Sequence, residues 1–530
     1  MQNKKDNKRA LANRRFIYIS DPSSIARLYL PENVEEKHLR DWVDDLSEVE
    51  VDTFIQEVYT QGWTTYWKTP LFEYDARPQH KRFLPLIDSG VQPLDVLIDQ
   101  SHKKGIEFLA GMRVNDNHGH VSVSQGVGSG SSFINSHPQW LLNETRLDPY
   151  YQMDKGTLDF TFDEVREYVS SVAAEIINNF DIDGIELCFR DRGYFPHKNG
   201  NDRKHLMTEM IASINTLLSE RSKTIGRNLI LGVRVPETID ECLTMGLDVS
   251  TWINKGLINY VSPQESMHSS TNAPVREFAD LIGDNDCGLY PAMQPWTSIR
   301  MRRRNGGSSI KLEQQYAILN NYYGEGADGF SVYNHFVPIK SAPFYPMQLQ
   351  ELLKLKEYQP GQKGFRRYTF DPMLHGQVGY GESKSATGAV KNNHVLIKRN
   401  GVNTGAYSFK VYESFENVKN AAMLIRAFNM TLNDHFKIRI NDNLISDDCI
   451  KIIDDEQLID VKFIVDPDSK KATGLPPVPD LPEEFCTLII DSETSIFKNG
   501  NNVLELELIK KDPNEDQDIL VDEIEVFVVI

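Results

Sequence analysis

Two periods of apolar and polar positions alternate along residues 16–357. Short apolar runs rich in β-branched and aromatic residues predict strands, and segments with apolar residues every three or four positions predict helices. The predicted strands are Phe16–Ser20, Trp63–Trp67, Glu107–Val114, the stretch Phe180–Asp191, Leu229–Val235, Leu257–Val261, Gly288–Met293 and Asp328–Asn334. The pattern from Glu35 to Tyr59 predicts a helix. Eight strands, most followed by a helix, favour a (β/α)8 TIM barrel of the α/β class over a doubly wound sheet.

The stretch Phe180–Asp191 is expected to form the fourth strand of this barrel. Because strand side chains alternate between two faces, its apolar residues share one face, which would meet the helices. The opposite face would line the pore and carries Glu186, Cys188 and Arg190. A carboxylate and a guanidinium inside a barrel need polar partners, since unpaired buried charge is very costly. Asp191 would stand at the strand's carboxyl end, where such barrels carry their chemistry.

From about Pro360 the helical period disappears and short β-like runs recur. They are His394–Lys398, Ala406–Tyr412, Ala421–Phe428, Phe436–Ile440, Val461–Val465, Thr487–Ile490, Val503–Leu508 and Leu520–Val529. Strands at this spacing predict an all-β sandwich of the jelly-roll type. We therefore expect a polar leader over residues 1–14, a catalytic barrel over 15–360 and a β-sandwich over 361–530. The sandwich would pack on the barrel or complete a homo-oligomer.

Charge and composition narrow the classes of function. The formal net charge of −19 argues against nucleic-acid binding, which needs a basic surface. Five cysteines without a CxxC pair predict neither a zinc site nor a disulfide framework. No apolar run approaches the ~20 residues of a membrane span, and no Gly-rich phosphate loop implies an organic cofactor. The start, Met1–Arg9, has no hydrophobic signal region, so we expect a periplasmic or secreted protein only if a signal was removed, and otherwise a cytoplasmic one.

The carboxyl ends of the predicted strands carry carboxylates, amides and aromatic rings, a set that suits an oligosaccharide or polysaccharide substrate. Glycoside hydrolysis needs two carboxyl groups, one protonated and one ionised. The candidate catalytic residues are Glu186, Glu237 and Glu265, with Asp191 in reserve. The candidate substrate-binding residues are Asn115, Asp116, His118, Arg190, Arg234, Trp296 and Asn334. Polar contacts with substrate are favoured over a metal site at Asn115–His118, because Asn and Asp clusters more often form turns.

Structural roles are open for the same residues. Glu186 could neutralise the arginines that face the pore, which by the same alternation are Arg113, Arg190 and Arg234. Glu237 could belong to the first turn of a helix, where acids favour the helix dipole. The run Arg300–Arg304 could hold a sulfate or carboxylate of the substrate, or form a solvated loop.

Several motifs together resemble one group of proteins. They are Arg113–His118, Asp183–Leu187, Arg234–Pro236, Gly246–Trp252 and Asp328–Asn334. In their order they resemble bacterial (β/α)8 glycoside hydrolase-like proteins of the family-10-like group, over residues 15–360. Within that group the chain is most similar to glycoside hydrolase family 167. This resemblance implies cleavage of a red-algal galactan such as carrageenan, with release of a disaccharide from the non-reducing end.

One departure from the group bears on activity. Members of this group often carry Asp where this chain has Cys188, and a thiol would not replace a carboxylate in ordinary retaining hydrolysis. Either another carboxylate serves, or the protein is a non-catalytic carbohydrate-binding or assembly protein with a degenerate barrel site. Chitinase-like barrels keep a terminal Glu on this strand, and Arg190 stands at that position here, so their mechanism is not expected.

Overall fold

A (β/α)8 barrel occupies the first part of the chain. The computed structural model describes residues 16–59, 63–75, 77–116, 131–142, 157–189, 193–196, 200–264, 269–295, 310–335, 349–370, 372, 395–454, 485–492 and 494–530. Its parallel strands are β1 (Phe16–Ser20), β2 (Thr53–Tyr59), β3 (Glu107–Arg113), β4 (Gly184–Cys188), β5 (Ile230–Val235), β6 (Tyr260–Pro263), β7 (Gly288–Leu289), β8 (Ala292–Met293) and β9 (Phe330–Tyr333). They pair in the order β7-β6-β5-β4-β3-β2-β1-β9-β8.

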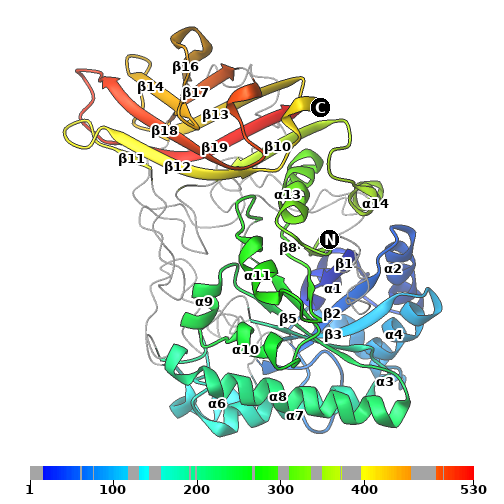
Figure 1. Ribbon diagram of the computed structural model, residues 1–530. Coiled ribbons are helices and arrows are strands. Elements are labelled where there is room, and N and C mark those ends of the chain that lie inside the picture. The colour runs from blue at the N-terminus through cyan, green and yellow to red at the C-terminus, as the bar shows by residue number, and fades with distance from the viewer. Residues whose placement is uncertain are drawn as a thin grey trace.

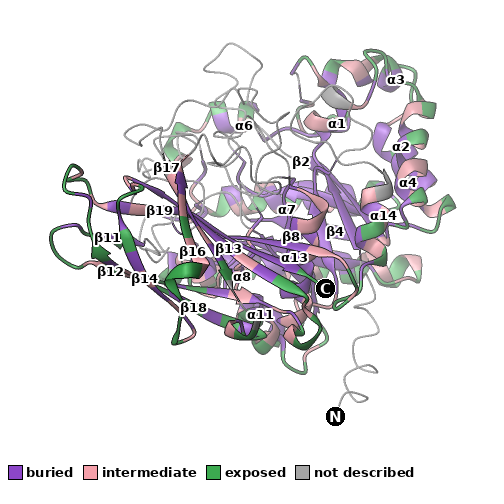
Figure 2. Ribbon diagram, turned by 90° about the horizontal axis from the view of Figure 1, so that it is seen from above, coloured by how far each residue is buried: buried purple, intermediate pink, exposed green. Residues whose placement is uncertain are grey.

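The two ends of this sheet meet in one kinked strand. Only Tyr290 and Pro291 separate β7 from β8. The Tyr290 N–H donates to the Val261 carbonyl of β6 at 3.0 Å, and the Pro291 carbonyl accepts from Ser331 of β9 at 2.9 Å. This segment therefore bridges β6 and β9 and closes the sheet, which confirms the predicted barrel. In Figure 2 the labelled barrel strands β2, β4 and β8 have the colour of buried residues.

Helices cover the outside of the barrel (Figure 1). The α-helices described in the barrel are α1 (Pro22–Leu28), α2 (Glu36–Glu48), α3 (Leu84–Asp88), α4 (Pro93–Lys103), α6 (Ser132–Asn135), α7 (Asp163–Asn179), α8 (Gly200–Ile225), α9 (Ile239–Thr244), α10 (Val249–Asn254), α11 (Val275–Ile282), α13 (Leu312–Gly324) and α14 (Leu349–Glu357). Ile185, Leu187 and Phe189 belong to the apolar cluster between helices and strands, as the alternation predicted. No helix in the described ranges is both long and apolar enough to cross a membrane.

The second strand differs from its prediction. It runs over Thr53–Tyr59, whereas the pattern had placed a helix there and the strand at Trp63–Trp67. The helix α2 ends at Glu48, and Glu50 takes a positive φ of 55° that helical backbone does not allow. All of β2 is buried, so its residues lack the polar-apolar alternation of a half-exposed strand.

The C-terminal part is a sandwich of two antiparallel sheets. Its strands are β10 (Phe365–Phe370), β11 (Leu396–Ile397), β12 (Thr404–Val411), β13 (Asn420–Phe428), β14 (His435–Ile440), β15 (Asn443–Leu444), β16 (Ile450–Asp454), β17 (Phe485–Ser492), β18 (Gly500–Lys510) and β19 (Ile519–Val529). One sheet has the order β10-β19-β13-β17-β16, with β11 also paired to β19, and the other β12-β18-β14-β15.

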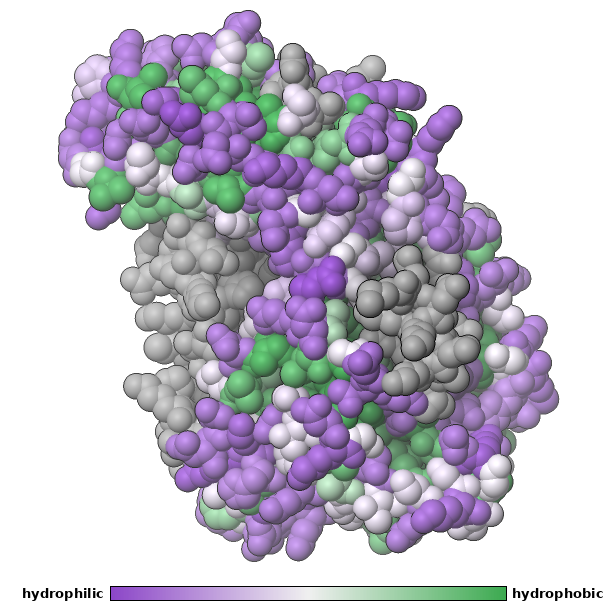
Figure 3. Space-filling model, in the orientation of Figure 1, coloured by the Kyte–Doolittle hydropathy of each residue, from purple (hydrophilic) through white to green (hydrophobic). Residues whose placement is uncertain are grey.

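This strand order confirms the jelly roll. Without the short β11 and the edge strand β16, the sheets read first-eighth-third-sixth and second-seventh-fourth-fifth, which is the two-Greek-key order of that fold. The sequence missed β10, and the predicted run Val461–Val465 lies outside the described residues. The face of the sandwich visible in Figure 3 is mainly hydrophilic, with smaller apolar areas. The domain limits expected at residues 15 and 360 stay predictions.

One barrel helix closes the edge of the sandwich. Figure 1 shows α13 directly beneath β10. Ala317 of α13 belongs to the apolar core of the sandwich, although the helix lies between two barrel strands in sequence. Asn320 of the same helix donates to Glu413 at 2.7 Å and to the Tyr368 hydroxyl at 3.1 Å. The barrel and the sandwich therefore share a core and a buried polar contact.

Candidate active site

Large side chains and glycines alternate inside the barrel. One lateral row through five neighbouring strands consists, in order, of Glu57, Gly111, Glu186, Gly232 and Tyr260. A Cβ atom at Gly232 would lie 2.0 Å from Cζ of Tyr260, and one at Gly111 would lie 3.0 Å from Cγ of Glu57. The glycines therefore leave the room that the carboxylates and the tyrosine ring need.

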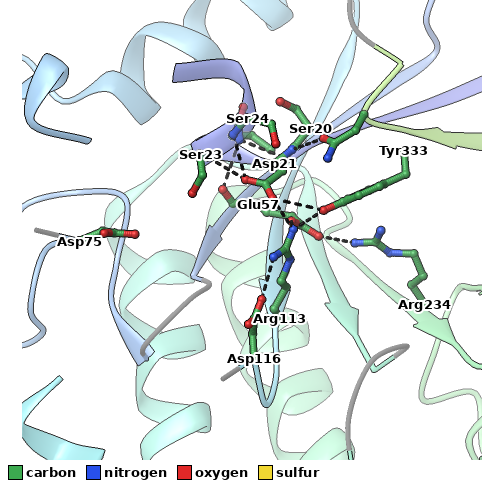
Figure 4. A network of polar contacts seen from close by, with 12 residues as sticks. Ser20, Asp21, Ser23, Ser24, Glu57, Asp75, Arg113, Asp116, Arg234 and Tyr333 are labelled. Atoms are coloured by element: carbon green, nitrogen blue, oxygen red, sulfur yellow. Dashed lines mark hydrogen bonds and ion pairs between the residues drawn. The ribbon is translucent and has the colours of Figure 1, made fainter. Parts of the chain in front are cut away.

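Arg113 binds three carboxylates at the carboxyl end of this interior (Figure 4). Its Nη2 lies 2.6 Å from Oδ2 of Asp21 and 2.7 Å from Oε2 of Glu57. Its Nη1 lies 2.7 Å from Oδ2 of Asp116. All four side chains are buried, so these charges interact with little screening by water.

Arg234 connects the second half of the same network. Its Nη2 donates to Oε1 of Glu57 at 2.5 Å, and its Nε lies 3.0 Å from Oε1 of Glu186. The other Glu186 oxygen accepts from the Tyr260 hydroxyl at 2.9 Å. The Tyr333 ring centroid lies 5.0 Å from Cζ of Arg234. Glu57 thus bridges the two arginines, and Glu186 is tied to the second.

The pKa values of two carboxyl groups in this network are shifted in opposite directions. Burial raises the pKa of Glu186 above its usual value, and Arg234 and the Tyr260 hydroxyl only partly oppose it. Burial also acts to raise the pKa of Asp21, but the guanidinium groups of Arg113 and Arg77 outweigh it and hold that pKa below its usual value. Glu186 is therefore the group that keeps a proton more readily, and Asp21 the one that stays ionised.

A second buried cluster supports Asp21. Arg77 forms an ion pair with Asp75 and donates to the Ser23 hydroxyl at 2.7 Å. The Ser23 hydroxyl is 3.0 Å from Nε2 of His80. Burial lowers the pKa of His80 to about 4, so its imidazole is neutral at pH 7. The Arg77 guanidinium, itself paired with Asp75, lies close enough to Asp21 to help lower the pKa of that carboxyl group.

Three predicted substrate-binding residues have structural contacts. Asn115 donates to the Leu158 and Gly193 carbonyls at 3.0 and 2.8 Å, which ties two connecting segments together. Asn334, with a positive φ of 55°, accepts from the Asp21 N–H at 3.0 Å and positions that carboxylate. Asp116 joins the network through Arg113.

Of the other residues singled out in the sequence, two lie in the described part of the chain and five lie outside it. Glu237 is buried just beyond β5, before the Thr238 cap of α9, so it precedes the helix rather than forming its first turn. Cys188 is buried between Arg113 and Arg234 in the register of the sheet. The calls that lie outside the described residues are His118, Arg190, Asp191, Glu265 and Trp296.

Sequence reasoning missed Glu57 and did not single out Asp21 among the carboxylates at strand ends. The predicted helix over Glu35–Tyr59 concealed Glu57. The signal that could have found it is the run Thr53–Tyr59, whose β-branched and aromatic residues surround Gln56 and Glu57. No group of three or more metal-binding side chains occurs in the ranges described above.

Known proteins resemble this chain at the level of family. The family described as glycosyl hydrolase-like 10 matches residues 15–280. Glycosyl hydrolase DigH of Escherichia coli strain K12 is 23% identical over 319 residues, which cover 52% of this chain and 67% of that protein. The Shigella flexneri protein of the same name matches with the same figures.

Solved structures match more loosely. The α-amylase of Geobacillus thermoleovorans has a TM-score of 0.40 at 13% identity, covering 94% of this chain and 99% of that chain. A Paenibacillus cycloisomaltooligosaccharide glucanotransferase has a TM-score of 0.34 at 10% identity, covering 97% of this chain and 57% of that chain. Scores this low carry no argument about activity, and the chain spans little more than half of the glucanotransferase.

Proposed function

From the premise that this chain belongs to the glycosyl hydrolase-like 10 family, we propose that it hydrolyses glycosidic bonds with carboxyl groups at the barrel mouth. The observation that carries the proposal is the unequal pair of Glu186 and Asp21. One carboxyl group has a raised pKa and the other a lowered one, within a single buried network. Carboxyl groups with pKa values pushed apart are the arrangement that acid and base roles require.

In this mechanism Glu186 donates a proton to the leaving oxygen of the sugar. Its raised pKa keeps it protonated at higher pH than an ordinary glutamate, which general acid catalysis needs. Asp21, ionised beside Arg113, stabilises positive charge on the sugar or activates the attacking water. Glu237, Glu265 and Asp191 stay candidates for the second carboxylate.

Changing Glu186 to Gln is the direct test. We expect the release of reducing sugar to fall about 10²–10⁴-fold, because the general acid is lost. The wild type should lose activity as pH rises through the pKa of Glu186, and this limb of the pH profile should be absent in Glu186→Gln. The matched control is Glu48→Gln on the exposed end of α2, which should keep full activity. Unchanged turnover in a folded Glu186→Gln variant would rule out this assignment.

The similarity to glycoside hydrolase family 167 extends the proposal to a substrate. We propose a red-algal galactan such as carrageenan, cleaved with release of a disaccharide. Both guanidinium groups of the described network are already bound to carboxylates, so neither is available for a sulfate group. For recognition of sulfate we propose other cations, with the run Arg300–Arg304 as the first candidate. Oligosaccharides of carrageenan and of unsulfated agar, compared by product analysis, test both points.

A second candidate function is carbohydrate binding without catalysis. Two points favour it: the resemblance to the family-10-like group implies an acid where Cys188 stands, and Glu186 has no exposed side-chain surface. Binding of the same oligosaccharides, measured by calorimetry without any release of reducing sugar, would support this alternative.

A further inference from the structure

Gln264 follows β6 and continues its inward-facing positions. Tyr260 and Ser262 face the interior, and Gln264 is the next residue of that alternation. Its backbone N–H donates to the Val235 carbonyl at 2.9 Å, which extends the pairing of β5 with β6. Its side chain is only 1% exposed. Gln264 therefore lies at the mouth of the barrel, in a fixed position.

Arg234 fixes the orientation of the Gln264 amide. Oε1 accepts from Nη1 of Arg234 at 3.2 Å. The reversed amide would bring its own N–H groups against a guanidinium that can only donate. The same Arg234 holds Glu57 and Glu186 through its other nitrogens. Gln264 is thus attached to the group that holds the candidate acid.

The Nε2 group of Gln264 has no hydrogen-bond partner among the residues that the structure describes. A buried N–H donor without a partner is destabilising, and native proteins contain few of them. The orientation of the amide excludes relief by a simple flip. An acceptor atom of a ligand bound beside this network would give the Nε2 group the hydrogen bond that it lacks.

We propose that Gln264 is a substrate-binding residue whose Nε2 donates to a hydroxyl oxygen of the sugar beside Glu186. The proposal rests on the proposed function of the site, since it takes a sugar as the ligand. Sugar hydroxyls both donate and accept, so they can satisfy this donor without adding charge to an acidic site. Sites built to bind a hydroxyl discriminate strongly against analogues that lack it.

The first test is the change Gln264→Met, which keeps the length of the side chain and removes both the Nε2 donor and the Oε1 acceptor. Without ligand, the unfolding temperature should change little, because the change removes a buried unpaired donor but also the Oε1 acceptor of Arg234. Its kcat/KM on the oligosaccharide that the wild type hydrolyses should fall about 10–100-fold. Gln517→Met, at an exposed glutamine of the sandwich, is the matched control and should change neither quantity.

Two further measurements separate binding from structure. Gln264→Glu keeps the acceptor for Arg234 but loses the donor, so its kcat/KM should be lowered as in Gln264→Met. Among the monodeoxy derivatives of the same oligosaccharide, one should have a lower kcat/KM than the parent sugar when the wild type hydrolyses it. With Gln264→Met, that derivative and the parent sugar should have the same kcat/KM. If that derivative is missing, Gln264 has a structural role only and the proposal is wrong.

Failure of the two proposals can be told apart. If the wild type hydrolyses no agar or carrageenan oligosaccharide, calorimetric Kd values replace KM. Weaker binding by Gln264→Met then supports the role of Gln264 while the hydrolase proposal fails. Equal binding by both proteins, or no binding by either, overturns the role of Gln264.

Discussion

Replacing Arg113 with Met should lower the free energy of unfolding by about 3–5 kcal/mol, as expected when one partner of a buried ion pair is removed. Asp21, Glu57 and Asp116 would all lose the guanidinium that they contact within 2.7 Å. Chemical denaturation at pH 7 measures the loss. We expect catalysis to be lost as well, because Asp21 would no longer be held ionised.

The control for this change is Arg40→Met. Arg40 forms ion pairs with Glu36 and Asp99 on the surface, and such pairs contribute about 0–1 kcal/mol. The deficit of Arg113→Met should also shrink between about pH 7 and pH 4. The unpaired carboxyl groups of the folded variant take up protons as pH falls, whereas Asp21 of the wild type, with its lowered pKa, stays ionised. A deficit that is small or independent of pH would contradict the network.

Replacing Gly232 with Ala should cost about 1–3 kcal/mol through overpacking and should also reduce activity. The added Cβ would lie 2.0 Å from Cζ of Tyr260, so the ring has to leave its position. The Tyr260 hydroxyl, which donates to Glu186 at 2.9 Å, would move together with the ring. Thermal unfolding and the pH profile of turnover measure the two effects.

The matched comparison uses a smaller side chain at position 260 and a second glycine. The double variant Gly232→Ala/Tyr260→Val should recover much of the stability, because the clash is gone, but not the activity. Gly105→Ala, at a glycine with open space and φ of +73°, reports the cost of strained backbone alone. If Gly232→Ala is as active as the wild type, the position of Tyr260 does not matter for the chemistry.

The sequence predicted those elements whose residues differ on their two faces. The fourth strand shows this best, since its apolar residues do pack on the helices and Glu186 does face the interior. Strand β2 was misplaced because both of its faces are buried, which removes the alternation. A buried strand and a helix are hard to tell apart on periodicity alone.

The pairing of charges was beyond sequence reasoning. Arg113 is 92 residues from Asp21, and Arg234 is 177 residues from Glu57. Alternation predicted which of these side chains face the pore, but contacts over such separations depend on the barrel closing in one register. The predicted structural role of Glu186 as a partner of Arg234 and its proposed catalytic role both fit the geometry, since the ion pair itself shapes its titration.

The helix shared by the two halves limits how this protein can evolve. Since Ala317 fills part of the sandwich core from a helix inserted before the last barrel strand, replacing the jelly roll would also require changes on this helix. Substitutions on either side of that contact must be compensated on the other. Relatives that carry the barrel without the sandwich would need a different, more polar surface on this helix.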